Sequence, residues 1–352
     1  MHDRAEQPDG SRRRTLVTGG AGFIGSHLVD ALIDRGDHVT VVDDLSTGSS
    51  SNLASTGPDD PRLEMIESTV TDAVAGPLID TPPFDEIHHL AASVGVVRIL
   101  ERPTESIETN IHETSALLRF AVERHPRRLP RVLLASSSEV YGLGGRGELL
   151  REDDTCTYGP TTAHRWSYGY AKAIDEFLAL AHHREDGLPI VIVRLFNIVG
   201  PRQSDRYGMV LPRFVKSACA GEDLLVHGDG TQVRTFCDVR DIVGPLIQLA
   251  AHPDATGRVV NIGSDSPLTV SNLAQRVVDC LDSVSRIRTI PYREAYADGF
   301  QDLPHRCPAL DRLRELVDFS PTITLEQTIR DIAKRLAHDQ VFASSSRAAP
   351  QR

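Results

Sequence analysis

The stretch Thr18-Gly19-Gly20-Ala21-Gly22-Phe23-Ile24-Gly25 decides the fold of this chain, because it joins an apolar run to a segment with helical periodicity. The apolar run is Leu16-Val17, and the helical segment continues from Ser26. Glycines at 19, 22 and 25 allow a sharp turn, bring main-chain N–H groups close to a pyrophosphate and let the helix pack tightly on the strand. The helix N-terminus then faces the anion. We predict a phosphate cradle, although its Gly-x-x-Gly-x-x-Gly spacing differs from the standard dinucleotide fingerprint.

Strands and helices are expected to alternate from this turn onward, which implies parallel pairing. We therefore predict an α/β fold with a doubly wound parallel sheet of the Rossmann type and a smaller C-terminal substrate-binding domain. The expected strands are 14–18, 38–42, 63–66, 87–90, 132–135, 190–193 and 259–262, and the main helices are 23–35, 105–124, 239–251 and 270–281. The expected divisions are a disordered leader over 1–13, a nucleotide-binding domain over 14–195 to which part of 236–262 returns, a mainly substrate-binding domain over 196–340, and a disordered tail over 341–352.

Two carboxylates, Asp43 and Asp44, end the second expected strand. They follow the glycines by about twenty residues, which is where a dinucleotide fold places the acceptor for the ribose 2′-hydroxyl. This position favours NAD over NADP as cofactor.

Charge and cysteine content exclude several other classes of protein. The net charge of −11 and a sequence pI near 5.7 give no nucleic-acid or membrane signature. Five cysteines without Cys-x-x-Cys spacing argue against a disulfide framework and against a zinc site, so we expect no metal. Arg194 interrupts the longest apolar segment, residues 188–199. We expect a cytoplasmic protein with no export signal and no membrane span.

Tyr168 and Lys172 are the sharpest candidates for chemistry, because a four-residue spacing on a helix places both on one face. Lowering the pKa of tyrosine by about three units from 10 requires ~4 kcal/mol, whereas an exposed charge pair supplies ~1 kcal/mol. Lys172 alone is therefore insufficient in water, but a closed pocket with a second positive charge, such as an oxidised nicotinamide ring, would suffice. Tyr168 could then take a proton from a substrate hydroxyl that also bonds Ser137, at the end of another strand.

Motifs along most of the chain resemble those of the extended short-chain dehydrogenase/reductases, in the group of nucleotide-sugar epimerases, dehydratases and decarboxylases. The resemblance covers about residues 16–332. The matching segments, in order, are Thr18 to Gly25, Val41 to Gly48, His89 to Ala92, Ser136 to Gly142, Tyr168 with Lys172, Arg194 to Arg202, His227 to Arg234, and Asn261 to Gly263.

The resemblance implies an NAD cofactor, a UDP-sugar or other nucleotide-sugar substrate, and a homodimer formed through helices near 105–124 and 164–183. The residues that it implies for the cofactor are Gly19, Gly22, Phe23, Ile24, Gly25, Asp43, Asp44, Leu45, Ser46, Thr47, Gly48, Val70, Leu90, Ala91, Ala92, Tyr168 and Lys172. Those that it implies for the substrate are Ser138, Asn197, Arg202, Arg234 and Arg306. One departure is Thr69, which stands where relatives usually carry an Asp that hydrogen-bonds the adenine.

Within the group, three positions favour decarboxylation. Ser138 replaces the Asp with which 4,6-dehydratases protonate the departing hydroxyl. Glu139 before Val-Tyr-Gly resembles the UDP-glucuronate decarboxylases and the related UDP-apiose/xylose synthases, whereas 4-epimerases usually carry a small or hydroxyl residue there. The run Arg165 to Tyr168 and the late segment around Arg306 resemble the same enzymes, and Arg306 would be their active-site arginine.

This combination is chemically consistent, since a ketone at sugar carbon 4 lies β to the carbon-6 carboxylate and allows carbon dioxide to leave. We predict Ser137, Glu139, Tyr168, Lys172 and Arg306 as catalytic residues. Glu139 and Arg306 are candidates for positioning the carboxylate and for delivering a proton to carbon 5 through water. The predicted function is a UDP-glucuronate decarboxylase forming UDP-xylose, with NAD regenerated in each turnover. The alternatives are a 4-epimerase, a 4,6-dehydratase and a non-catalytic nucleotide-binding protein.

Overall fold

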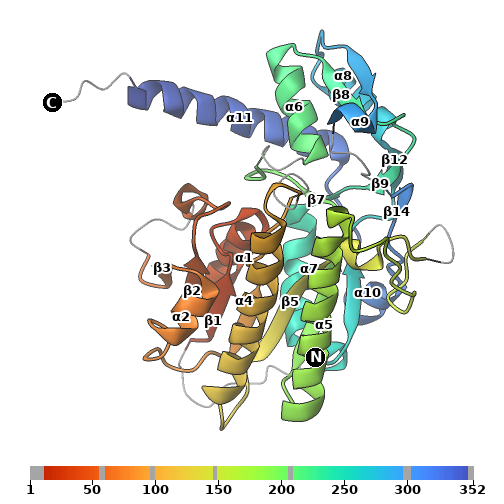
Figure 1. The fold of residues 1–352 in the computed structure, drawn as a ribbon. Helices are drawn as coiled ribbons and strands as arrows, with labels where there is room; N and C mark the ends of the chain where they lie inside the picture. The colour runs from red at the N-terminus through yellow and green to blue at the C-terminus, as the bar shows by residue number, and fades with distance from the viewer. Residues whose placement is uncertain are drawn as a thin grey trace.

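A seven-stranded parallel sheet forms the centre of the larger part of the molecule (Figure 1). The computed structural model describes residues 12–54, 60–95, 100–145, 149–204, 209–295 and 303–347. The strand order is β11-β6-β5-β4-β1-β2-β3. Their bounds are β1 Arg14–Thr18, β2 His38–Asp43, β3 Leu63–Glu67, β4 Glu86–His89, β5 Arg131–Ser137, β6 Ile190–Leu195 and β11 Val259–Ile262. The predicted doubly wound parallel sheet is confirmed, and the late strand β11 lies at its edge beside β6.

Helices cover both faces of this sheet because successive strand residues point to opposite sides. Leu16 belongs to one apolar core with α4 (Pro103–Glu123) and α5 (Ser167–Asp186). Val17 belongs to the other, with α1 (Phe23–Asp34) and α7 (Val239–Ala251). The short helix α2 (Val70–Ala75) packs beside α4. The carboxyl ends of β1, β4 and β5 therefore open toward one edge, where the predicted site residues follow them.

A smaller part of the chain packs beyond this edge around its own apolar core. It contains α6 Val210–Ala220, β8 Leu224–His227, β9 Val233–Thr235, β12 Pro267–Thr269, α8 Val270–Cys280, β13 Ile287–Ile290, α9 Tyr292–Ala295 and β14 His305–Arg306. The remaining short elements are η1 Ser50–Leu53, η2 Ser138–Tyr141, η3 His164–Trp166, β7 Ile198–Val199, β10 Cys237–Asp238, η4 Pro253–Ala255 and α10 Asp311–Leu316.

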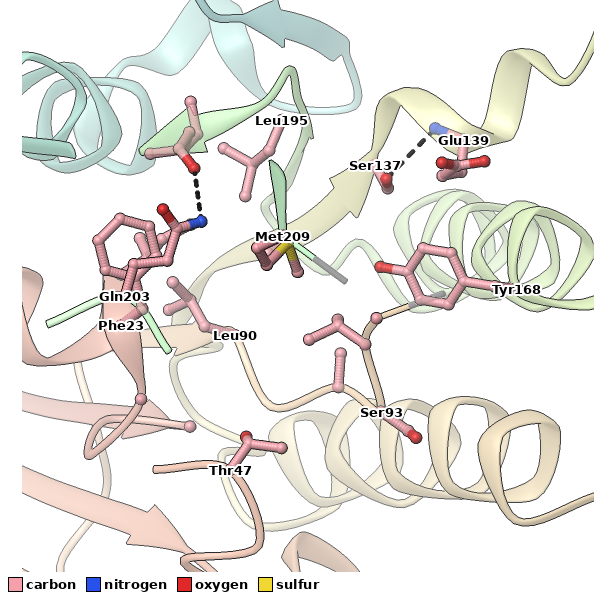
Figure 2. Close-up of a pocket in the computed structure, with 18 of the residues that line it drawn as sticks. Phe23, Thr47, Leu90, Ser93, Ser137, Glu139, Tyr168, Leu195, Gln203 and Met209 are labelled. Carbon is pink, nitrogen blue, oxygen red and sulfur yellow. Dashed lines mark hydrogen bonds between the residues drawn. The ribbon is translucent and has the colours of Figure 1, made fainter. Parts of the chain in front are cut away.

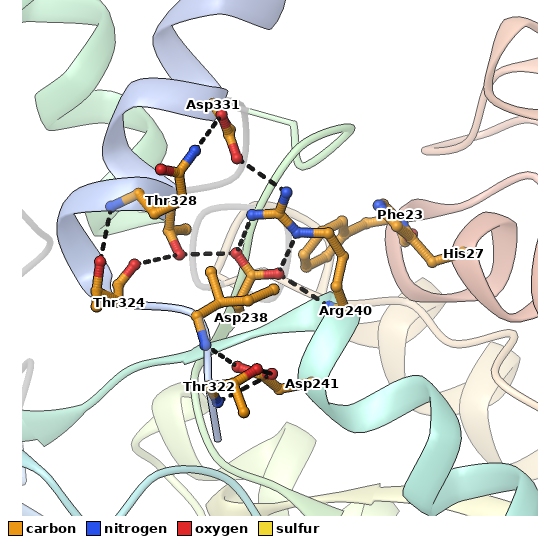
Figure 3. Close-up of polar contacts among 11 residues, drawn as sticks. Phe23, His27, Asp238, Arg240, Asp241, Thr322, Thr324, Thr328 and Asp331 are labelled. Carbon is orange, nitrogen blue, oxygen red and sulfur yellow. Dashed lines mark hydrogen bonds and ion pairs between the residues drawn. The ribbon is translucent and has the colours of Figure 1, made fainter. Parts of the chain in front are cut away.

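Polar contacts fasten the last helix, α11 (Leu325–Arg347), to the start of α7 (Figure 3). The Asp238 carboxylate caps α7 by accepting from the Arg240 N–H at 2.9 Å, and it also accepts the Thr328 hydroxyl at 2.7 Å. Arg240 reaches Asp331 at 2.8 Å. These contacts tie the C-terminal helix to the sheet-bearing part of the molecule.

The prediction of disorder from residue 341 is wrong for residues 341–347, because α11 continues to Arg347. Residues 325–347 contain neither glycine nor proline, so the sequence provides no strong helix terminator there. Residues 348–352 lie outside the described part of the chain, as do residues 1–11 of the predicted leader.

Candidate active site

The glycine turn packs so closely that side chains are excluded from two of its positions. A Cβ on Gly19, whose φ is +70°, would lie 2.7 Å from the Ala91 nitrogen. A Cβ on Gly25 would lie 2.1 Å from the Gly19 carbonyl oxygen. The N-cap of α1 is Gly22, and no side chain caps the helix. The first turn of α1 therefore presents main-chain N–H groups with no competing side chain, which fits a dinucleotide pyrophosphate.

Asp43 and Asp44 occupy different environments at the end of β2. Asp43 is buried, and its carboxylate accepts the Ala21 and Leu45 N–H groups, each at 2.9 Å. Burial raises the pKa of Asp43. Asp44 is exposed and accepts the Ser46 N–H at 2.9 Å. Asp43 therefore braces the glycine turn, while both residues border the same cavity.

One cavity of about 470 Å³ runs from the glycine turn to Tyr168. In Figure 2, Phe23 and Thr47 lie on the opposite side of this cavity from Glu139. The predicted residues that line it are Gly19, Gly22, Phe23, Ile24, Gly25, Asp43, Asp44, Ser46, Thr47, Val70, Leu90, Ala91, Ala92, Ser137, Ser138, Glu139, Tyr168, Lys172, Asn197, Arg234 and Arg306. The sequence therefore identified both ends of one cavity.

Three predicted residues are not in this lining. Gly48 packs behind it, where a Cβ would lie 2.9 Å from the Ala21 carbonyl oxygen. Leu45 packs against the core on the α1 side of the sheet. Arg202 forms an ion pair with Asp30 of α1 at 2.7 Å. This position does not support the prediction of Arg202 as a substrate ligand, because an acidic side chain of α1 holds its guanidinium outside the cavity wall.

Tyr168 and Ser137 meet at the carboxyl end of β5 (Figure 2). The Ser137 hydroxyl accepts the Glu139 N–H at 3.2 Å, which starts the helical turn η2 and fixes the Ser137 side chain. Burial and the negative charge of Glu139 raise the pKa of Tyr168, and hydrogen bonding to Ser137 opposes this rise. The protein without cofactor therefore keeps Tyr168 as a neutral phenol, so ionisation at neutral pH requires added positive charge.

Glu139 is clamped by two arginines from separate segments. Arg165 of η3 binds it through two nitrogens at 2.7 and 3.1 Å, and Arg306 of β14 binds it at 2.6 Å. Burial alone would raise the pKa of Glu139, but the two guanidinium groups lower it to about 2. A carboxylate with this pKa carries no proton near neutral pH. The arrangement therefore favours a positioning role for Glu139 and argues against its predicted delivery of a proton.

The expected substrate ligands Asn197 and Arg234 border the cavity on the side of the smaller part of the chain. The Asn197 side-chain nitrogen is buried and has no hydrogen-bond partner among the described residues. Arg234 of β9 lies in register with Arg306 of β14, which places two cationic residues on neighbouring strands. A buried amide donor and an arginine side chain at the cavity wall suit an anionic, phosphate-bearing ligand.

The sequence interpretation missed three residues near the site. Arg165 lay inside a quoted motif without a role, although it precedes Tyr168 by three residues. Asp175 lies seven residues after Tyr168, a helical spacing that signals a shared face. Glu113 of α4 borders the cavity, where burial and the nearby Asp44 charge raise its pKa to about 7. No spacing in the sequence places Glu113 near Asp44.

Comparison with known proteins identifies the family. Residues 15–263 match the model of the NAD dependent epimerase/dehydratase family. The chain belongs to this family. Its cofactor is accordingly NAD, and the uncapped first turn of α1 and the close-packed glycines fit that group.

Several members of this family are similar to the chain over most of its length. The UDP-N-acetyl-alpha-D-glucosaminuronate decarboxylase of Bacillus cytotoxicus is 38% identical, with 91% of this chain and 96% of the relative covered. UDP-glucuronic acid decarboxylase 4 of Arabidopsis thaliana is 34% identical over 95% of this chain and 71% of the relative. A solved dTDP-glucose 4,6-dehydratase from Streptomyces venezuelae with NAD bound superposes with a TM-score of 0.81 at 28% identity, covering 94% and 98% of the two chains.

None of the described helices combines the length and apolar character needed to span a bilayer. No cluster of three or more His, Cys, Asp or Glu side chains in the described ranges is arranged to hold a metal ion.

Proposed function

We propose that this protein is a UDP-glucuronate decarboxylase that forms UDP-xylose with internally recycled NAD. The observation that supports this proposal best is the Arg165–Glu139–Arg306 cluster beside Tyr168. Arg306 binds a protein carboxylate in the ligand-free protein, so it presents the charge and geometry that a substrate carboxylate needs. Two relatives named as uronate decarboxylases support the same reaction.

Each residue around the cavity has a separate role in this reaction. When bound, NAD supplies reversible oxidation at sugar carbon 4. Tyr168 accepts the proton of the 4-hydroxyl, and Ser137 hydrogen-bonds the same oxygen. Arg306 holds the carbon-6 carboxylate next to the new ketone until carbon dioxide leaves and the bonding electrons remain as an enolate. Carbon 5 then takes a proton from water, hydride returns to carbon 4, and Tyr168 gives its proton back to the 4-oxygen. Asn197 and Arg234 bind the substrate diphosphate, which fixes the sugar relative to Tyr168.

Mass spectrometry of the products tests this function. UDP-glucuronate should lose the mass of carbon dioxide without added cofactor turnover. Since one relative is named for the N-acetylated uronate, UDP-N-acetylglucosaminuronate belongs in the same panel. A product of unchanged mass would establish 4-epimerisation instead, and loss of water from a neutral nucleotide-hexose would establish dehydration.

A matched pair of variants ties the activity to the proposed base. Tyr168→Phe should lower kcat by about 10³-fold or more, because general base catalysis typically contributes 10²–10⁴-fold. Tyr170→Phe on the same helix removes a hydroxyl from a partly exposed ring and should leave kcat unchanged. Equal turnover by Tyr168→Phe and wild-type protein would contradict the assignment.

We further propose a homodimer formed through α4 and α5. Tyr170, Ile174 and Phe177 form an exposed apolar stripe on α5, and the Phe177 side chain is 75% exposed. A second copy of the same stripe would cover it around a two-fold axis. Phe177→Asp should convert the dimer to a monomer in sedimentation experiments, and a monomeric wild-type protein would contradict this.

A cytoplasmic location is also proposed, and it is supported by five cysteines that all remain free thiols. Cell fractionation with an antibody against the protein tests it. Recovery in the cytosolic fraction is expected, and recovery with membranes or in the medium would contradict it.

A further inference from the structure

A third polar side chain shares the helix face that carries Tyr168 and Lys172. Asp175 follows them on α5, so the three stand at i, i+4 and i+7 and point to the same side. Asp175 is fully buried, and Lys172 is 2% exposed. The Lys172 ammonium donates to the Asp175 carboxylate at 3.1 Å. An ion pair with so little exposure is uncommon unless further hydrogen bonds support it.

A chain of buried hydrogen bonds leads from the glycine turn to this ion pair. The Ala91 N–H lies 3.4 Å from the Thr18 hydroxyl oxygen, and the Thr18 hydroxyl lies 2.7 Å from His89 Nδ1. His89 Nε2 lies 3.1 Å from the hydroxyl oxygen of Thr114 on α4. Burial raises the pKa of the Asp175 carboxyl, and the Lys172 ammonium, followed by the Thr114 hydroxyl, opposes this rise.

The donors in this chain can all point in one direction. Burial and the Lys172 charge lower the pKa of His89 to about 3, so its ring is neutral and carries one proton. With that proton on Nε2, His89 donates to Thr114, which leaves the Thr114 hydroxyl proton available to point toward the Asp175 carboxylate. His89 Nδ1 then accepts the Thr18 hydroxyl proton, and Thr18 accepts the Ala91 N–H. The dipoles of this chain can therefore all be oriented toward the Asp175 carboxylate, which helps to stabilise a buried negative charge whose direct hydrogen bond comes from Lys172.

We propose that Asp175 is a positioning residue that holds the Lys172 ammonium beside Tyr168 and sets the pH range in which Tyr168 acts as a base. The part that concerns the base rests on the proposed function. Asp175 does not line the described cavity. It therefore acts through Lys172, and not by contact with substrate.

The charges around Tyr168 give the direction of the effect. The groups that act on Tyr168 are Glu139 of η2, Arg306 of β14 and Asp175 of α5 itself. The Lys172 ammonium acts on the neutral His89 of β4 and on Asp175, and the neighbouring Glu176 also acts on Asp175. The Asp175 charge raises the pKa of Tyr168. The Asp175 charge therefore opposes the lowering of the Tyr168 pKa by the positive charge of Lys172. Its removal should allow Tyr168 to ionise at lower pH.

Asp175→Asn tests the charge, because the amide keeps a hydrogen-bond acceptor for Lys172. We expect the acidic limb of the kcat–pH profile to move down by about one pKa unit with KM changed less than about twofold. Asp186→Asn is the matched control, since Asp186 pairs with His182 at an exposed end of the same helix. If the acidic limb of Asp175→Asn lies at the same pH as in wild type and Asp186→Asn, the proposal that Asp175 sets the pH range of Tyr168 is overturned.

Thr114→Val tests the positioning, because it keeps the Asp175 charge and removes the hydroxyl that favours the charged form of this carboxyl. We expect kcat to fall several-fold while the acidic limb stays in place. Unchanged kcat would overturn the proposed positioning, and this variant remains informative if Asp175→Asn fails to fold.

A substrate-free measurement separates this inference from the proposed function. The tyrosinate absorbance of Tyr168, obtained by subtracting Tyr168→Phe, can be titrated with NAD present in both the native and the Asp175→Asn background. A lower midpoint without Asp175 supports the inference even if no uronate is turned over, and equal midpoints overturn it.

Discussion

The glycine turn comes from eight consecutive residues, whereas the charged cluster around Glu139 takes its members from η2, η3 and β14. At the turn, a Cβ on Gly25 would lie 2.1 Å from a backbone oxygen, so contacts at short range fix the geometry. At the cluster, Glu139 forms ion pairs with Arg306 at 2.6 Å and with Arg165 at 2.7 Å, although Arg306 is distant from it in the chain. The first region is determined locally, and the second depends on completion of the whole fold.

This difference predicts which substitutions each region tolerates. Backbone atoms cannot yield to a new methyl group without moving the strand and helix that carry them. Charged side chains can rearrange, but a buried carboxylate needs its counter-ions at any pH where it is ionised. Substitutions that add atoms should therefore destabilise the glycine turn, the cofactor end of the cavity, most strongly. Substitutions that remove charge should destabilise the Glu139 cluster, the reaction end of the cavity, by an amount that depends on pH.

Gly25→Ala should have the largest effect. Its methyl group would overlap the Gly19 carbonyl, so we expect the free energy of unfolding to fall by ~3 kcal/mol and NAD affinity to drop by about tenfold or more. Urea unfolding and calorimetric titration with NAD measure the two losses.

Gly244→Ala in α7 is the control for this substitution. The added methyl would meet only the end of the Gln248 side chain, at 3.9 Å, and alanine favours a helix over glycine by ~1 kcal/mol. We expect equal or higher stability and unchanged NAD affinity. Similar losses in both variants would show that the tight packing at Gly25 is not what the turn requires.

Glu139→Gln should have an intermediate effect that depends on pH. The folded pKa of about 2 lies below the usual value of 4.5, so the stabilisation is fully present above about pH 4.5 and disappears as pH falls toward 2. We expect a loss of ~2–3 kcal/mol at pH 7 that shrinks between pH 4.5 and pH 3. Urea unfolding at a series of pH values measures it.

Glu185→Gln provides the matched control, because Glu185 pairs with Arg184 at the surface of α5. Exposed pairs contribute ~0–1 kcal/mol, so this variant should resemble wild type at every pH. A Glu139→Gln deficit that persists unchanged to pH 3 would contradict the ion-pair interpretation.

The same contrast explains what the sequence could predict. The sheet, the glycine turn and the Tyr168–Lys172 pair follow from spacings within one or two elements. Glu139 and Arg306 were named from a family resemblance, but their direct contact needed the fold. Arg202 was named from the resemblance alone, and nothing near it in the sequence indicates its ion pair with Asp30. The extension of α11 was missed because residues 341–347 lack the regular apolar spacing on which the helix predictions relied.

Glu113 places a titratable carboxyl at the cofactor end of the cavity, near the glycine turn. Its substitution should have the smallest effect on stability. Burial and the negative charge of Asp44 raise its folded pKa to about 7, so the folded protein retains a proton that the unfolded chain releases near 4.5. Stability therefore falls as pH rises from about 4.5 to 7 and then levels off. Glu113→Gln removes this penalty. The free energy of unfolding of the variant should match that of wild type near pH 4.5 and exceed it by ~1 kcal/mol at pH 8, once partial exposure is allowed for.

Glu108→Gln on the exposed face of α4 is the control, and its stability should not diverge from wild type in this way. A Glu113→Gln curve parallel to wild type would mean that steric packing alone governs this end of the cavity, whereas divergence would show that the cofactor end also carries a pH-dependent electrostatic strain.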